Sequence, residues 1–454
     1  MSFKMEIAVK DEFEELLNQQ ADIKYVDAIF TDLCGHIRGK RIPLLEIGKI
    51  FKEGIQLPSS AHFLDVAGGV TNTLGLGWID GDPDQNFFPV KGTFKAVPWD
   101  KEIIQTLISM QDDDGIPSDI DPRNMLIKIS NFFKKLKLKP VVAFELEFYL
   151  VKKERDNDGK PIPAAGESKT QVYSIAELDL FRNLLDEIIS NAQSQDIPAT
   201  AATSEFSQCQ YELNLKHTGD LIKAADDAAL LRRVIKETSN KHGYDATFMA
   251  KPFLDGTGNG MHIHLSLYDE NEKNVFSSSK NTGSEIMQNA IAGMQAALHD
   301  SLALFIPDRN GFRRLQPNQF VPMNKTWSYN NRSAAFRIPA GSNSSRRVEH
   351  RIASANSNPY LVLSAILAAV HYGISKKLTP SYKIKQGNYG GNLEDNDETF
   401  PTSLEESIKK FENSKLLKNY FGEEYMKIYA SAKRGEELFL QSEFIPKEEY
   451  DYYL

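Results

Sequence analysis

The sequence is poor in cysteine, with only Cys34 and Cys209 among its 454 residues. Two thiols cannot build the disulfide framework of a small secreted domain, and their scarcity favours a reducing compartment. Long hydrophobic runs are missing too: stretches such as 361–369 are too short to cross a bilayer, and residues 1–17 lack the apolar core of a signal peptide. We therefore expect a cytoplasmic protein without a membrane partner.

Dense clusters of lysine and arginine are also lacking. The chain has 62 acidic and 53 basic side chains, a formal net charge of -9 at pH 7, which argues against nucleic acid as the main partner. Hydrophobic residues make up 41% of the sequence, so the chain can bury a core across two or three domains. Small-molecule chemistry is the function class that these properties favour.

A linker-like segment divides the chain. From Gln111 the sequence QDDDGIPSDIDPR is rich in acids, glycine and proline, with Asp121 suited to cap a helix and Pro122 to begin it. We expect an N-terminal domain over 1–112 and a larger domain over 113–454.

Local patterns predict several elements of these domains. Two β-prone runs, 25–32 and 37–42, flank a Gly-containing turn and predict a hairpin. Helical periodicity follows residue 122 and recurs over 221–241, whereas 152–169 has no apolar period and predicts a solvated loop. The larger domain should therefore mix helices with strands.

Acidic residues share one face of two predicted strands. Alternation over 142–150 projects Glu145 and Glu147 together, away from the apolar side chains, and alternation over 211–215 exposes Glu212 in the same way. Each pattern alone is also typical of a half-buried strand with a wet outer face.

Histidines and a further acid occupy similar positions. A third predicted strand, 261–267, carries His262, His264 and Ser266 on its polar face, and a fourth carries Glu349 between two arginines. Paired histidines on a strand indicate either a metal or phosphate site or simply exposed polar residues.

The acids matter most if these strand faces converge. With Glu205, seven residues before Glu212, five carboxylates would then lie together, and desolvated carboxylates are costly unless a cation compensates them. Hard divalent ions such as Mg²⁺ or Mn²⁺ prefer such oxygen ligands and share them with phosphate oxygens. Spacing alone leaves the convergence open.

An arginine-rich segment over 309–351 adds positive charge. Its eight arginines alternate with aromatic side chains, and planar guanidinium groups suit the recognition of carboxylates and phosphates. A solvated basic face is the simpler alternative. Since the chain has no Walker A sequence, nucleotide binding would have to use metals and arginines.

The chain resembles the glutamine synthetase family over nearly its whole length. The resemblance rests on the segments PVVAFELEFYL, EFSQCQYELNL, ATFMAKPF, GNGMHIHLSL, NRSAAFRIP and RRVEHRIASANSNPYLVLSAILAA, in the order of the family. It implies an α+β fold: an N-terminal β-grasp domain, and a C-terminal catalytic α/β domain whose antiparallel sheet is backed by helices. It also implies a ring-shaped homo-oligomer, expected as a dodecamer, in which a neighbouring N-terminal domain closes each active site.

The resemblance assigns a role to each site residue. One divalent ion would be held by Glu147, Glu205 and Glu212, and a second, near the ATP phosphates, by Glu145, His262 and Glu349. Substrate glutamate would be bound by Gly258, Arg314 and Arg351. The phosphoryl groups and nucleotide would contact Arg332, Arg337, Arg347, His264 and Ser266, with Arg332 and Arg314 acting in catalysis. ATP would phosphorylate the γ-carboxylate of glutamate, and an amine would then displace phosphate.

Two departures from the family indicate the amine. Ammonium-using members of the family share two acidic residues that bind ammonium. This chain has Pro58 and Phe320 at those two positions. Without those carboxylates nothing offsets the dehydration of ammonium, whereas an alkyl amine can bury methylenes against Phe320, and Trp327 is a further candidate for that wall. The sequence thus resembles the γ-glutamyl-amine ligases, especially glutamate-putrescine ligases.

Alternatives remain at this stage. They are an ammonia-using glutamine synthetase, a catalytically inactive sensor of the same fold, and a guanidino phosphotransferase on a related fold. Thr257 and Cys209 also depart from the family pattern, and the sequence assigns them no role. The amine, the preferred metal and the ring size stay open.

Overall fold

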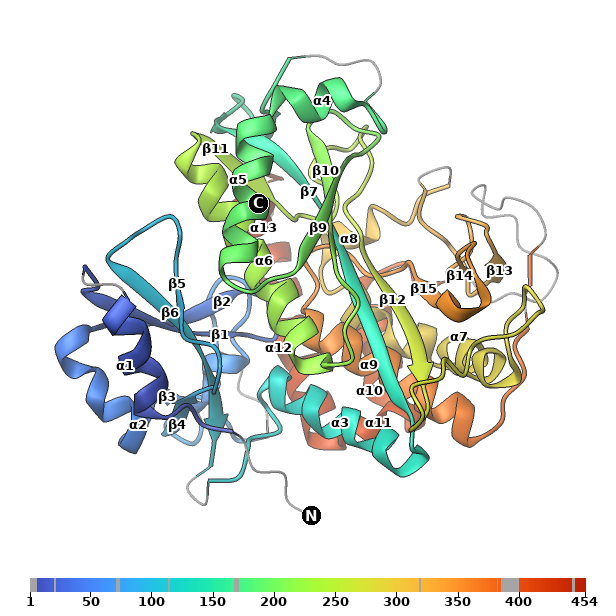
Figure 1. Cartoon of the computed structure of the whole chain (residues 1–454), viewed down its shortest axis with the longest axis horizontal. Coiled ribbons are helices and arrows are strands. Elements are labelled where there is room, and N and C mark those ends of the chain that lie inside the picture. Colours follow the sequence, from blue (N-terminus) through green and yellow to red (C-terminus); the bar gives the residue numbers. More distant parts are fainter. Residues whose placement is uncertain are drawn as a thin grey trace.

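The structure is a computed structural model. It describes residues 6–19, 22–70, 74–112, 115–166, 171–317, 320–381, 383–384, 400–442 and 446–454. Two β-sheets dominate it, and Figure 1 shows the smaller sheet, in blue, beside the larger one.

The smaller sheet has six strands in the order β2-β1-β6-β4-β3, with β5 paired to β6. Only β1 and β6 run parallel. The predicted hairpin is confirmed, with Tyr25 of β1 opposite Pro43 of β2. The strand bounds are β1 Tyr25–Thr31, β2 Ile37–Pro43, β3 Ile55–Pro58, β4 Asp84–Pro89, β5 Lys95–Ala96 and β6 Ile103–Gln111.

Helices α1 (Lys10–Gln19) and α2 (Ile50–Glu53) accompany this sheet. Phe13 of α1 packs with Phe30, Phe87 and Ile104 in a separate small core, where it is only 2% exposed. The N-terminal unit therefore has apolar packing of its own.

The larger sheet has nine strands in the order β13-β14-β15-β12-β7-β10-β9, with β8 and β11 also paired to β7. All pairs are antiparallel except β13 with β14. The bounds are β7 Lys139–Arg155, β8 Pro161–Pro163, β9 Ala199–Ser204, β10 Gln210–Leu215, β11 Tyr244–Thr247, β12 Met261–Tyr268, β13 Trp327–Tyr329, β14 Phe336–Ile338 and β15 Val348–His350.

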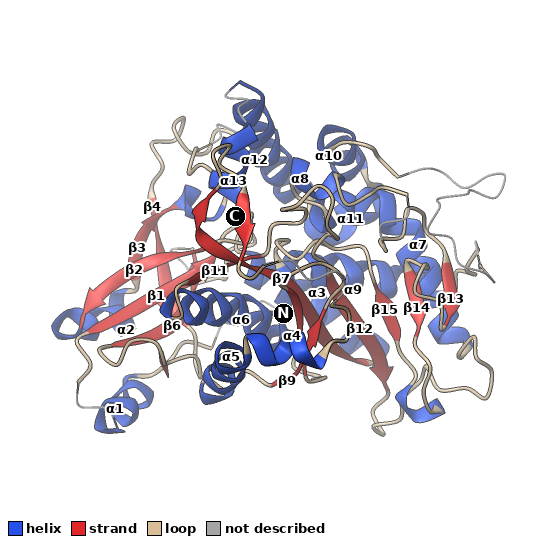
Figure 2. Cartoon of the chain, turned by 90° about the horizontal axis from the view of Figure 1, so that it is seen from above, coloured by secondary structure: helices blue, strands red, loops and turns tan. Residues whose placement is uncertain are grey.

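One face of β7 belongs to the main core. Val142, Phe144, Leu146, Phe148 and Leu150 are fully buried, and helices α3 and α6 contact this strand. Figure 2 shows these helices beside the sheet. The helix bounds are α3 Pro122–Leu136, α4 Ile175–Leu180, α5 Arg182–Ser194, α6 Leu221–Lys241, α7 Glu285–Phe305, α8 Arg309–Phe312, α9 Pro359–Ser375, α10 Leu404–Asn413, α11 Lys415–Phe421, α12 Glu423–Ser442 and α13 Pro446–Tyr453.

Both predicted helices are confirmed, and α6 has the predicted bounds, 221–241. The loop predicted over 152–169 is wrong in part: β7 continues to Arg155 and pairs with β8. The end of β7, residues 152–154, is exposed and β8 has only three residues, so neither segment shows apolar alternation, which is why periodicity missed them.

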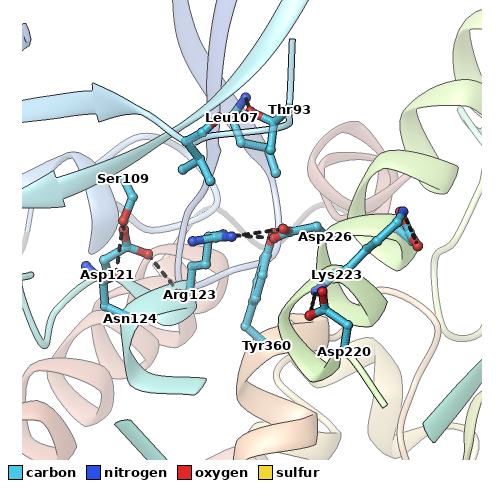
Figure 3. Close-up of polar contacts among 12 residues, drawn as sticks. Thr93, Leu107, Ser109, Asp121, Arg123, Asn124, Asp220, Lys223, Asp226 and Tyr360 are labelled. Carbon is cyan, nitrogen blue, oxygen red and sulfur yellow. Dashed lines mark hydrogen bonds and ion pairs between the residues drawn. The ribbon is translucent and has the colours of Figure 1, made fainter. Parts of the chain in front are cut away.

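Polar contacts fasten the start of α3 to its neighbours (Figure 3). Asp121 caps the helix, accepting a hydrogen bond from the Arg123 amide at 2.8 Å and another from Ser109 Oγ of β6 at 2.6 Å. The Arg123 guanidinium donates two hydrogen bonds to Asp226 of α6, at 3.0 and 3.1 Å, and Tyr360 of α9 donates a third at 2.7 Å. These contacts fix α3, α6 and α9 relative to one another.

The predicted fold class is confirmed: a mixed N-terminal sheet with helices and a larger, mostly antiparallel sheet backed by helices form an α+β structure. The division at residue 112 stays a prediction. Within the described residues, no helix has the length and apolar character needed to cross a membrane.

Candidate active site

The pairing of β7 with its two neighbours brings the predicted acids together. Glu147 lies opposite Glu212 of β10, and Glu145 lies opposite His262 of β12 on its other side. Because side chains in register across an antiparallel pair stand about 5 Å apart, these groups share one patch of the sheet.

Strand β15 adds a further acid. Glu349 is opposite His264 of β12 and Arg337 of β14, and it is only 1% exposed. Arg337 Nη1 donates to Glu349 Oε2 at 2.7 Å, and Arg351 Nη1 donates to Glu349 Oε1. The carboxylate therefore sits between the acidic patch and the arginine-rich segment.

Two sets of side chains are arranged to hold a cation. The ligand atoms of Glu145, His262 and Glu349 lie within 4.8 Å of one another, and so do those of Glu147, Glu212 and His262. The first set is the predicted one. In the second, His262 completes the triplet, while Glu205 lines the same cavity without belonging to it.

The ionised forms of Glu205 and Glu212 are destabilised by their surroundings. Burial, followed by the charge of Glu147, raises the pKa of Glu205 to about 8, although Arg332 and Arg351 act in the opposite direction. Burial and the charges of Glu145 and Glu147 raise the pKa of Glu212 well above its ordinary value. A divalent cation would offset this repulsion, so the donor set fits such an ion.

Two other acids remain ionised despite their burial. Burial raises the pKa of Glu145, but hydrogen bonds from His262 and His264 outweigh it and hold that pKa well below its ordinary value. The His264 contact is 2.8 Å, from Nε2 to Glu145 Oε1. Burial also raises the pKa of Glu349, but the charges of Arg351, His264, His262 and Arg337 together outweigh it and lower that pKa to about 2.

Gly258 allows Arg314 to approach the site. A Cβ atom at residue 258 would lie 2.4 Å from Arg314 Cγ and 2.8 Å from the carbonyl oxygen of Ala250. Arg314 is 2% exposed, and its Nη1 donates to Ser354 Oγ at 2.9 Å. Any side chain at residue 258 would therefore displace the Arg314 side chain, and its guanidinium with it.

A cavity of about 520 Å³ contains nearly the whole predicted site. Its lining includes every predicted site residue except Ser266: Glu145, Glu147, Glu205, Glu212, Gly258, His262, His264, Arg314, Phe320, Arg332, Arg337, Arg347, Glu349 and Arg351. Ser266 lies further along β12, opposite Val141, and is 5% exposed. The roles of these residues remain predictions.

The apolar wall of the cavity differs from the expected one. Phe320 stacks on Phe206, with ring centroids 4.3 Å apart and an interplanar angle of 28°. Trp327 is 4% exposed in β13 and is not part of the lining, so its suggested place in this wall is wrong. Phe320 also has a φ of 32°, which is uncommon for a residue other than glycine.

Sequence reasoning missed several lining residues. They are Tyr173, Thr203, Phe206, Gln210, Val321, Pro339 and Ala340, together with Thr257, to which the sequence assigns no role. Asn214 also lines the cavity: the alternation over 211–215 places it on the polar face with Glu212, to which it donates a hydrogen bond at 3.0 Å. Phe206 follows Glu205 in a loop, where no periodicity marks it.

Comparison with known proteins agrees with this geometry. The sequence model of the family named glutamine synthetase, catalytic domain, matches residues 119–453. γ-Glutamylputrescine synthetase PuuA of Escherichia coli (strain K12) is 38% identical over 436 residues, covering 94% of this chain and 91% of the relative. Glutamate–isopropylamine ligase of a Pseudomonas species is 32% identical over 414 residues, covering 89% of each chain.

Solved structures show the same fold. GmaS without ligand is 25% identical with a TM-score of 0.83, covering 95% of this chain and 96% of the other. The chain therefore belongs to the glutamine synthetase family. As predicted, it is a ligase of the acid–amine class.

Proposed function

We propose that this enzyme joins the γ-carboxyl group of glutamate to a primary amine, with putrescine as the leading candidate. ATP would drive the reaction through a γ-glutamyl phosphate intermediate. The observation that carries this proposal is the cavity itself, in which paired acids, arginines and a Phe206–Phe320 wall lie together. The 38% identity to γ-glutamylputrescine synthetase of Escherichia coli supports the same substrate class.

The acidic side chains would hold Mg²⁺ or Mn²⁺. Glu147, Glu212 and His262, with Glu205 beside them, form one set, and Glu145, Glu349 and the same histidine form the other. Bound divalent ions would neutralise the phosphate oxygens of ATP. Hydrogen bonds fix the carboxylates: His264 orients Glu145, and the Gly260 amide donates to Glu147 Oε2 at 2.6 Å.

The arginines would bind the two anionic reactants. Arg314 and Arg351 suit the carboxylates of glutamate, and Gly258 leaves them room. Arg332, Arg337 and Arg347 would face the transferred phosphoryl group, and His264, with Ser266 further along the strand, would lie toward the nucleotide. Because a carboxylate and a phosphate repel each other, this positive charge lets them approach for in-line transfer.

The wall of the cavity would select the amine. Methylenes of an alkyl amine packed on Phe206 and Phe320 gain about 0.8 kcal/mol each when removed from water. Ammonium has no methylenes to bury on this surface. Phe320 also stands at the position where ammonium-using members of the family have an ammonium-binding carboxylate. An ammonia-using glutamine synthetase is therefore the weaker proposal.

Steady-state phosphate release tests this choice. With glutamate, ATP and Mg²⁺ present, we expect a higher kcat/KM for putrescine than for ammonium, and no release without an amine. A higher kcat/KM for ammonium than for every alkyl amine would overturn the amine assignment. Phosphate release without any amine would instead favour a different phosphotransfer reaction.

We also propose that the enzyme works in the cytoplasm as a ring-shaped homo-oligomer, with the dodecamer as the expected form. The scarcity of cysteine favours a reducing compartment. Sedimentation analysis would measure the particle mass, and a monomer that is fully active would contradict the expectation that a neighbouring subunit closes the site.

A further inference from the structure

A second cavity, of about 700 Å³, lies away from the active site. It is bounded by the β1–β2 hairpin, α6, α12 and α13, and no residue lines both cavities. Helix α6 lies between the two sheets in both views (Figures 1 and 2). The proposed ligase reaction makes no use of this space.

The cavity is basic, although the whole chain has a net charge of -9. Its lining has seven lysines and arginines against four aspartates and glutamates. Concave surfaces lined by one sign of charge concentrate counter-ions of the other sign. The lining therefore favours an anionic ligand.

Most of the lining acids already have partners. Asp27 accepts from Arg41 and from Arg233, each at 2.7 Å. Glu436 pairs with Lys433 at 2.8 Å. These pairs leave Arg232 and Lys236, two other cations on α6, without an acidic partner among the described residues.

Arg232 is the clearest of these uncompensated cations. It is 8% exposed, and its Nη2 donates to the carbonyl oxygen of Ser357 at 2.5 Å, while its buried Nε has no hydrogen-bond partner. No acid among the residues described by the structure forms an ion pair with it. A buried guanidinium remains charged and is costly unless an anion compensates it.

Lys236 lies one helical turn beyond Arg232 and lines the same cavity. Its only hydrogen bond recorded among the described residues is to the backbone oxygen of Leu454, at a long 3.4 Å. Glu237 also lines the cavity, yet it forms no ion pair with Lys236 within the described part of the chain. Two neighbouring cations thus share one space.

We propose that this cavity binds a small anion with two or more negative charges, carried by phosphate or carboxylate groups, between Arg232 and Lys236. Arg38, which already pairs with Asp32, and Lys40 also line the cavity from β2, so a bound ligand would lie between the N-terminal hairpin and α6. A ligand that binds only the folded protein raises its unfolding temperature. This site is independent of the proposed ligase reaction.

Calorimetric titration of the whole protein, in EDTA, tests the proposal with two probes, pyrophosphate and citrate. Sodium chloride at equal ionic strength is the reference. Because the active site also carries arginines, the titrations use an Arg347→Gln background, which removes one anion contact there. We expect at least one probe to bind and to raise the unfolding temperature, and preference for one probe identifies phosphate or carboxylate as the recognised group.

Matched variants locate the bound anion. Lys236→Gln should weaken binding at least tenfold, and Arg232→Gln should do the same. Lys241→Gln, on the exposed end of α6, should leave it unchanged. If Arg232→Gln does not fold, Lys236→Gln decides alone. Failure of both probes to bind, or equal binding by Lys236→Gln and the parent, would overturn the proposal. Ligase turnover, measured with Lys236→Gln in the otherwise wild-type enzyme, should be unaffected in either case.

Discussion

Glu147 lies directly opposite Glu212 in the antiparallel pair formed by β7 and β10. Two carboxylates in register destabilise a sheet unless a cation lies between them. A cation bound between the two carboxylates would remove this repulsion. The adjacent His262 supplies a further ligand atom within 4.8 Å.

Glu212→Gln should separate folding from metal binding. Removing one of the repelling charges should raise the unfolding temperature of the metal-free enzyme, while weakening Mg²⁺ binding by at least about tenfold. Thermal unfolding with EDTA and with Mg²⁺ measures both effects. Glu154→Gln, at an exposed position of β7, is the control, and equal Mg²⁺ stabilisation of the two variants would contradict the metal assignment.

The stability of the metal-free enzyme should depend on pH through Glu205. Burial and the charge of Glu147 raise the pKa of Glu205 from 4.5 to about 8, so the native state retains a proton that the unfolded chain releases. The retained proton stabilises the native state fully below pH 4.5, the pKa of Glu205 in the unfolded chain. This stabilisation is lost as the pH rises through about 8, the pKa in the folded enzyme.

A divalent cation should reverse that trend, because it takes the place of the proton. The Mg²⁺-induced rise in unfolding temperature should therefore be larger near pH 8 than near pH 5. Melting curves with Mg²⁺ or EDTA across this range check the sign. A Mg²⁺ effect that decreases with rising pH would be inconsistent with the acidic site.

The stack of Phe320 on Phe206 should control amine selectivity. Phe320→Ala removes part of the apolar wall and should weaken putrescine binding by about 1–2 kcal/mol, which is roughly a 5- to 30-fold rise in KM. Phe320→Glu should shift the ratio of kcat/KM values toward ammonium. Leu254→Ala, at an exposed residue outside the cavity lining, is the control. An unchanged ratio in both Phe320 variants would place amine selection elsewhere.

The contact between Arg123 and Asp226 should be a strong determinant of stability. Arg123→Ala leaves a buried carboxylate without its cation and should lower the free energy of unfolding by about 3–5 kcal/mol. Denaturant unfolding measures this loss. The exposed pair of Lys128 with Asp119 offers the comparison, since Lys128→Ala should cost no more than about 1 kcal/mol. Similar losses of free energy in the two variants would argue against a stabilising role for the contact between α3 and α6 (Figure 3).

Much of the fold and site was predictable from local patterns. Alternation along β7 marked Glu145 and Glu147, and periodicity gave the bounds of α6. The pairing of Glu147 with Glu212 could not be predicted from spacing, because strand register depends on contacts between distant segments. Phe206 was missed because a loop residue has no periodicity. Spacing also does not show that His262, rather than Glu205, has a ligand atom within 4.8 Å of those of Glu147 and Glu212, because this depends on side-chain geometry.

The most direct test of the proposed reaction is to identify the product by mass when putrescine and ammonium compete at equal concentrations with glutamate, ATP and Mg²⁺. The account predicts γ-glutamylputrescine as the main product, formed together with equal amounts of ADP and phosphate. Glutamine as the main product, or an amide formed without ATP consumption, would contradict it.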